Sequence, residues 1–266
     1  MRGDERDGDL RRGRRERGRR GVSVLRDIAA AFGWLSIVPV PAYADGRPTR
    51  WFPLVGWMFG GVAYVIARAA GLLGFGLFGI VLTAALLTAA WAVLSRFLHW
   101  DGVADAADGL LGGDSPERRR EIMHDSTIGA FGTTTIVLLA MLQVFAVAAL
   151  IGSLDFWPLV AAPVLGRLSA AVGLWTVPRS STSGLAARLP ASEGWFAWFV
   201  ASALVVPLLV ISPNHAPMVF VGVIAGMLVP RVLASPAGGI SGDLLGASVL
   251  FVETGVLVAS ALLSGG

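Results

Sequence analysis

The 266-residue sequence contains no cysteine and no lysine, so all 21 of its basic side chains are arginine. Without cysteine, the chain has no disulfide bonds, thiolate nucleophiles or zinc–thiolate sites. Without lysine, it lacks the amine that Schiff-base enzymes and P-loop enzymes need. Charge of either sign is scarce, because only 15% of the residues are charged whereas 55% are hydrophobic.

This shortage of charge, with a mean hydropathy of +0.71, is too great for one water-soluble core. We therefore predict an all-α, polytopic transmembrane helical bundle with the lipid bilayer as its partner. A spanning helix needs about 20 mostly apolar residues. About seven segments qualify, namely 53–74, 76–95, 131–151, 156–177, 195–212, 216–234 and 244–264.

An eighth apolar segment, residues 28–40, is too short to span and contains Pro39 near its end, with Pro41 just after it. We expect it to form a short interfacial or re-entrant N-terminal helix.

Arginine is concentrated near the amino terminus, where it alternates with glycine and acidic residues. Such a composition does not fold alone, so residues 1–26 are predicted to be a disordered arm and 27–266 a single membrane-embedded catalytic domain. A nucleic-acid-binding tail is the alternative. No folded reader or aromatic platform accompanies the arm, however, and we expect no nucleic-acid partner.

The distribution of arginine also predicts the orientation. Arginine is retained on the cytoplasmic side of membranes, which indicates a multi-pass protein of the cell inner (plasma) membrane with a cytoplasmic N-terminus. The long polar connections 96–130, 178–194 and 235–243 fall on the same side, and the first two of them carry arginine, whereas the short turns carry none. A composite site built from these cytoplasmic loops is therefore expected.

The most informative residues are three aspartates in the loop after the second span. Asp101, Asp105 and Asp108 are spaced by four and three residues, so on a helix they share one face. Carboxylates this close repel one another unless a cation neutralises them. Mg²⁺ is the natural candidate, because it prefers carboxylate oxygens and shares its remaining positions with substrate phosphates. Small residues such as Gly102 let a phosphorylated substrate approach the backbone. A simply solvated acidic loop is the alternative.

A second acidic segment follows, beginning with a helix start at Ser115. Glu117 and Glu121 are predicted to lie on an exposed, salt-bridged surface. Asp125, followed by Ser126, lies at the entry to the third span, where we expect its carboxylate to meet the first three aspartates.

A third polar segment, residues 235–243, is rich in glycine and contains a single acid. Backbone amides near Gly242 can hold phosphate oxygens, because they precede a helix N-terminus. Asp243 can add to the metal shell or bind a substrate hydroxyl.

Four further side chains have two open interpretations each. Arg167 and Arg231 lie inside predicted spans, where charge is costly, so each either binds phosphate or neutralises an internal carboxylate. His99 and His124 either act as acid or base or are hydrogen-bonded interface histidines.

Residues 98–109 (LHWDGVADAADG), with 117–123 (ERRREIM) and Asp125-Ser126, strongly resemble the cobalamin synthase family, the adenosylcobinamide-GDP ribazoletransferases. Residues 50–56 resemble the entry to the first span of that family, and residues 238–247 resemble its carboxyl-terminal loop. The resemblance extends from about Phe32 to the end of the chain.

The resemblance implies joining of adenosylcobinamide-GDP to alpha-ribazole, or its 5'-phosphate, with release of GMP and a requirement for Mg²⁺. We assign as catalytic residues Asp101, Asp105, Asp125 and His99. The expected metal ligands are Asp101, Asp105, Asp108 and Asp125. The expected substrate-binding residues are Gly102, Ser126, Arg167, Arg231, Gly242 and Asp243.

Two other functions are weighed. A CDP-alcohol phosphotransferase also uses an Asp-Gly-containing aspartate motif at a membrane face, but with a different spacing. A transporter would use intramembrane arginines as an anion path, whereas the acids here cluster in one loop. The nucleotide released, GMP, CMP or none, distinguishes the three. Whether the chain forms a homo-oligomer stays open.

Overall fold

The computed structural model describes residues 24–40, 46–180, 186–189 and 194–264, and these residues are almost entirely helical. Their only strand-like pairing is an isolated bridge between Arg179 and Ile240. Six helices are long and apolar enough to cross a membrane, and a seventh apolar helix, α8, is slightly shorter. The predicted all-α polytopic bundle is therefore confirmed.

The seven predicted spans correspond to seven helices whose ends agree within three residues. They are α2 (Phe52–Leu72), α3 (Leu77–Leu94), α6 (Ala130–Gly152), α7 (Pro158–Thr176), α8 (Trp195–Ile211), α9 (Ala216–Ala237) and α10 (Gly242–Ser264). The agreement follows from composition, because long apolar runs bounded by Gly, Pro and polar residues leave little choice of helix ends.

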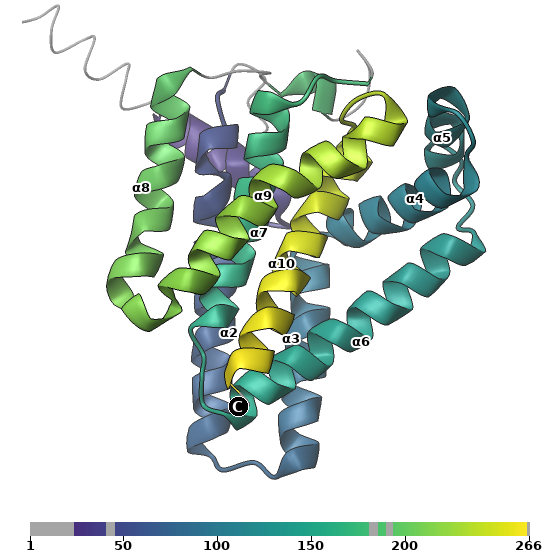
Figure 1. Cartoon of the computed structure of the whole chain (residues 1–266). Helices are drawn as coiled ribbons and strands as arrows, with labels where there is room; N and C mark the ends of the chain where they lie inside the picture. The colour runs from purple at the N-terminus through teal and green to yellow at the C-terminus, as the bar shows by residue number, and fades with distance from the viewer. Residues whose placement is uncertain (1–23, 41–45, 181–185, 190–193, 265–266) are drawn as a thin grey trace, which may run out of the picture.

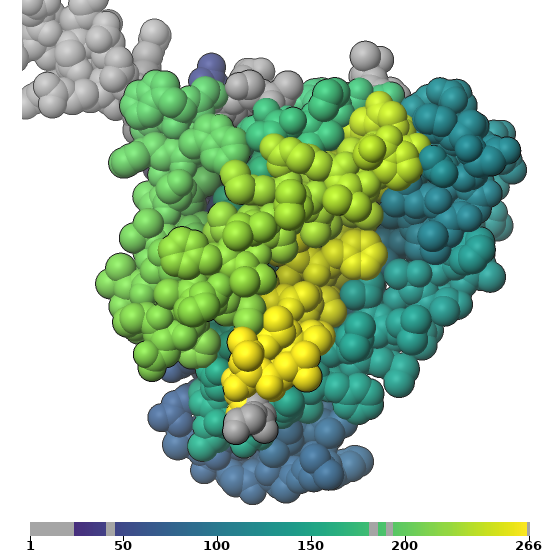
Figure 2. Space-filling model, in the orientation of Figure 1, coloured from purple at the N-terminus to yellow at the C-terminus, as the bar shows by residue number. Residues whose placement is uncertain are grey.

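The centre of the bundle is α7, in which all residues from 158 to 174 are buried. It packs against α2, α9 and α10, and α10 is itself largely buried. The outer helices keep large apolar side chains exposed, including Leu86 on α3 and Phe145 on α6. Exposed faces this apolar are typical of helices that contact lipid. Figure 2 shows α10 lying between α9 and α6 on one face.

The long polar connections gather at one end of the bundle and the short turns lie at the other (Figure 1). At the end with the long polar connections, residues 178–194 and 235–243 meet directly. The amide of Ile240 donates to the carbonyl of Pro178 at 2.8 Å, and the amide of Ser180 donates to the carbonyl of Ile240 at 3.1 Å. The loops thus come together as predicted, although residues 181–185 and 190–193 lie outside the described residues.

The short N-terminal helix covers residues 24–35 instead of the predicted 28–40. It begins inside the predicted arm, of which residues 1–23 lie outside the described part of the chain, and its end is fixed where Ser36 Oγ donates to the carbonyl of Phe32. An ion pair between Asp27 and Arg50 ties this helix to the 3-10 turn Thr49–Trp51, which directly precedes α2. It is too short to span, as expected.

The first long connection is mostly helical. The helix predicted to start at Ser115 is confirmed as α5 (Pro116–Met123), with Ser115 as its N-cap. The aspartates that we expected in a loop lie on a further helix, α4 (Leu98–Gly112), which corrects that part of the prediction. Two consecutive residues with left-handed backbone, Arg96 (φ 55°) and Phe97 (φ 58°), turn the chain out of α3. As a result α4 runs across the end of the bundle and not along it (Figure 1).

Candidate active site

The site is built where α4 crosses α10. At the crossing, a β-carbon on Gly102 would lie 2.5 Å from the carbonyl oxygen of Asp243. Only glycine permits this approach. Gly102 therefore brings the two helices together, and the backbone of α10 occupies the space that we expected a substrate to use.

The close crossing places Asp105 among other carboxylates. Burial, followed by the negative charges of Asp243, Asp101 and Asp108, raises the pKa of Asp105 to about 7, and His124 opposes this shift. Asp105 and Asp243 are partly buried, whereas Asp101 is exposed. Asp243 comes from the other end of the chain, so the cluster depends on the tertiary fold. The helical spacing of the first aspartates is confirmed, because all three lie on α4.

Asp108, an expected metal ligand, has another partner. Its carboxylate accepts hydrogen bonds from the amides of Gly129 at 2.7 Å and Gly132 at 2.8 Å, and its side chain is buried. These amides belong to the N-terminus of α6, whose free N–H groups and dipole favour a carboxylate. Asp108 thereby fixes the start of α6 against α4.

The carboxylate of Asp125 is bound within its own turn. Its carboxylate accepts hydrogen bonds from the amide of Thr127 at 2.9 Å and from the hydroxyl of the same residue. These bonds, aided by the charge of Arg118, lower the pKa of Asp125. Asp125 and the neighbouring Ser126 are exposed.

The carboxylate oxygens of the cluster are suitable donors for Mg²⁺, although the side chains do not form a complete coordination shell. In the described part of the chain, no three His, Asp or Glu side chains are grouped so that they could hold a metal ion. The oxygens of Asp101, Asp105 and Asp243 are nevertheless the type that Mg²⁺ prefers. A cation would relieve the repulsion that, after burial, contributes to the raised pKa of Asp105. Mg²⁺ often takes only one or two carboxylates and completes its shell with water and substrate phosphates.

His99 lies on the buried side of α4, lining a mostly apolar cavity with Gly242. Only 3% of its surface is exposed, and neither ring nitrogen has a hydrogen-bond partner among the described residues. Burial, and secondarily the charge of Arg167, lowers the pKa of His99 well below its usual value. The imidazole is therefore neutral at physiological pH.

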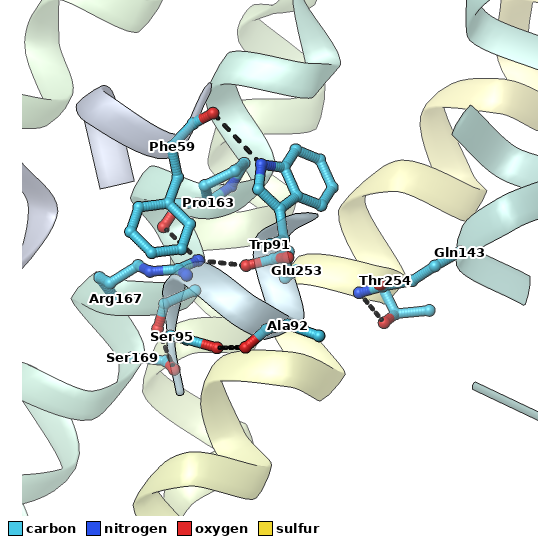
Figure 3. Close-up of polar contacts among 11 residues, drawn as sticks. Phe59, Trp91, Ala92, Ser95, Gln143, Pro163, Arg167, Ser169, Glu253 and Thr254 are labelled. Carbon is cyan, nitrogen blue, oxygen red and sulfur yellow. Dashed lines mark hydrogen bonds and ion pairs between the residues drawn. The ribbon is translucent and has the colours of Figure 1, made fainter. Parts of the chain in front are cut away.

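Arg167 forms an ion pair with Glu253 inside the bundle (Figure 3). Both side chains are almost completely buried, and the guanidinium lies 4.4 Å from the ring centroid of Phe59. Of the two interpretations left open, the internal ion pair is the one observed. Glu253 was missed in the sequence analysis, although a single acid inside a predicted apolar span is the pattern that would have revealed it.

Arg231 remains accessible. It is exposed and donates to the carbonyl of Met227 on its own helix. It lines a cavity together with Pro178, Gly238 and Gly239, at the end of the bundle that carries the polar loops. Its guanidinium is thus available to an anion.

The basic residues of α5 organise the same end of the bundle. The expected exposed ion pairs are present, from Arg118 to Glu121 at 2.6 Å and from Arg120 to Glu117 at 2.8 Å. Arg119 and Arg120 also donate, each at 2.8 Å, to the carbonyls of residues 236 and 237. These contacts cap the C-terminus of α9, where unpaired carbonyls favour cations.

Comparison with known proteins identifies the family. The model of a family described as cobalamin-5-phosphate synthase matches residues 27–261. This chain belongs to that family. The match begins at Asp27, the partner of Arg50, so the arm before it lies outside the matched region and every candidate site residue lies inside.

Several relatives of this member of the cobalamin-5-phosphate synthase family are named adenosylcobinamide-GDP ribazoletransferase. The protein of Pseudomonas fluorescens is 35% identical over 82% of this chain and 88% of its own length. That of Ralstonia pickettii is 34% identical over 85% of this chain and 91% of its own length. That of Corynebacterium glutamicum is 36% identical over 58% of this chain and 52% of its own length. No solved structure matches.

Proposed function

We propose that this protein carries out the final nucleotide-loop assembly of cobalamin biosynthesis. It joins adenosylcobinamide-GDP to alpha-ribazole, or its 5'-phosphate, and gives adenosylcobalamin, or its 5'-phosphate, with GMP. Membership of the cobalamin-5-phosphate synthase family and the names of the relatives support this reaction. We further propose that the enzyme requires Mg²⁺ and lies in the cell inner membrane with its N-terminus and polar loops in the cytoplasm.

The observation that carries the proposal is the position of Asp105. Burial, followed by the charges of Asp243 on α10 and Asp101 on its own helix, raises the pKa of this carboxyl group to about 7. Such repulsion has no structural benefit and is characteristic of functional sites. A bound Mg²⁺ would neutralise the diphosphate of the substrate and the charge on the departing GMP.

Each carboxylate has its own proposed role in this reaction. Asp101 and Asp105 are the principal metal ligands, and Asp243 supports them from α10. Asp243 is also better placed than Asp125 to receive the proton of the attacking ribazole hydroxyl, because its charge acts on Asp105 whereas the carboxylate of Asp125 is bound to Thr127. The hydroxyl attacks the phosphorus nearer the cobinamide.

Arg231 is the proposed phosphate-binding residue. Its cavity includes the glycines of residues 238 and 239, and these precede α10, which carries Asp243. Arg167 is a poor candidate for this role, because Glu253 already neutralises it inside the bundle. Asp108 supports the site indirectly by holding α6 against α4.

The proposal is tested with membranes that contain the wild type or the variants Asp101→Ala and Asp105→Ala. Production of GMP and of the cobalamin product is measured from adenosylcobinamide-GDP and ribazole, with and without Mg²⁺. Each variant is expected to lose on the order of 100-fold in rate. Asp114→Ala is the matched control, because Asp114 is an exposed acid of the α4–α5 connection.

Unchanged turnover in both variants would refute the site. CMP release from a CDP-alcohol would instead favour the phosphotransferase, and transport without nucleotide release would favour a carrier.

A further inference from the structure

A second polar cavity lies at the opposite end of the bundle, among the short turns. It is open, with an empty volume of about 880 Å³, and α2 contributes Tyr64 and Arg68 to its wall. The α6–α7 turn contributes Asp155 and its neighbours, and the α8–α9 turn contributes Ser212 and His215. The reaction proposed above uses none of these residues, because its side chains belong to the other end of the helices.

The polar groups of this cavity are held in place before any ligand arrives. His215 Nε2 lies 2.9 Å from Asp155 Oδ2, and Ser212 Oγ lies 2.7 Å from His215 Nδ1. Ser264, at the end of α10, donates to the same oxygen of Asp155 at 2.8 Å. Two segments that are distant in sequence, the α8–α9 turn and the end of α10, therefore converge on the carboxylate of Asp155. Its other oxygen, Oδ1, has no hydrogen bond among the described residues.

Arg68 supplies the opposite charge. It lies near the end of α2, and its guanidinium is 5.9 Å from the ring centroid of Phe156. In the part of the chain that the structure describes, it makes no ion pair, with Asp155 or with any other acid. The cavity thus presents a cation and an anion that do not neutralise each other.

A wall that holds a guanidinium and an oriented carboxylate matches a ligand that carries both charges. Inorganic phosphate alone would meet the repulsion of Asp155. Tyr64 and Trp157 in the wall are of the type found where membranes meet water. On the same helix as Arg68, the apolar side chains of Val65 and Ile66 are exposed, so a ligand with acyl chains would be covered by lipid at its other end.

We propose that this cavity binds the headgroup of a zwitterionic phospholipid that has a primary amine. Arg68 binds the phosphate and Asp155 Oδ1 binds the ammonium, while His215 and the two serines hold the carboxylate in position. The proposal does not depend on the reaction assigned to the other end of the bundle.

The test measures lipid binding to the purified full-length protein in detergent, by thermal stability and native mass spectrometry. The probes are short-chain phosphatidylethanolamine, short-chain phosphatidylglycerol, soluble phosphoethanolamine and inorganic phosphate. The wild type is expected to bind phosphatidylethanolamine best. Arg68→Gln and Asp155→Asn are each expected to weaken that binding about 10-fold or more, whereas Arg118→Gln, an exposed arginine at the other end, is expected to leave it unchanged.

Several outcomes would overturn the proposal. Equal binding by the wild type and Arg68→Gln would show that Arg68 does not bind the phosphate. The Arg68→Gln variant leaves the hydrogen bonds of Asp155 intact. If phosphatidylglycerol binds as tightly as phosphatidylethanolamine, Asp155 does not bind an ammonium group. Binding of inorganic phosphate or phosphoethanolamine as tight as that of the lipid would indicate a small-anion or small-zwitterion site instead of a lipid site.

Discussion

The carbonyl oxygen of Asp243 lies 2.5 Å from the position that a β-carbon on Gly102 would occupy. Gly102→Ala should therefore push α4 away from α10 and separate Asp105 from Asp243. We expect a loss of about 1–3 kcal/mol in stability, as is typical of overpacking, and a fall in GMP release of at least about 10-fold.

The matched control for this prediction is Gly61→Ala on α2, where a β-carbon would meet nothing within 4 Å. It should keep full activity. Equal activity of the Gly102 and Gly61 variants would show that the close crossing does not position the carboxylates.

The charge of Asp105 should destabilise the protein in the absence of Mg²⁺. Its pKa is about 7 in the folded protein, against 3.8 for the ordinary side chain. Ionisation therefore disfavours folding increasingly as the pH rises through this window, and the effect is complete above about pH 7. Asp105→Asn removes the charge. In Mg²⁺-free detergent we expect it to raise the melting temperature by about 2–4 °C at about pH 8, and by less at about pH 5.

In the presence of Mg²⁺, the wild type should be the more stable of the two proteins. Because an ion that binds only the folded state stabilises it, Mg²⁺ should raise the melting temperature of the wild type more than that of Asp105→Asn at about pH 8. The same increase in both proteins would argue against Asp105 as a ligand.

The buried pair of Arg167 and Glu253 should behave as a unit. Removing one partner leaves an uncompensated charge inside the bundle, so Arg167→Gln and Glu253→Gln should each lower stability by about 3–5 kcal/mol. The double variant should lose less than either single variant, which thermal unfolding in detergent would measure. If the single losses simply add, the two side chains do not depend on each other.

Asp108 should act chiefly on the stability of α6. Asp108→Ala removes the acceptor of two amide hydrogens and should lower stability by about 1–2 kcal/mol, whereas Asp108→Asn keeps one oxygen acceptor and should lose less. The Mg²⁺ concentration that half-activates the Asn variant should stay near the wild-type value. A shift as large as that of Asp101→Asn would restore Asp108 as a direct metal ligand.

The sequence predicted the membrane helices well because their pattern is local. Each span is a long apolar run interrupted only by turn residues, and helix formation in lipid satisfies every backbone group within the run. The grouping of the long connections at one end also follows from the order of the spans, because long and short connections alternate along most of the chain and alternate connections lie on the same side of the membrane. The exception is α4. Its aspartates and small residues lack the apolar length of a span, so the sequence predicts a loop there, although the aspartates have helical spacing.

Composition and spacing are sufficient to predict the class of protein, the positions of its spans and the aspartates that mark its family. Which carboxylates meet depends on the packing of the helices. The charge of Asp243 acts on Asp105 because two helices cross at Gly102, and Arg167 is neutralised by a glutamate on another span. Such pairings depend on contacts between distant segments, and no local pattern in the chain encodes them.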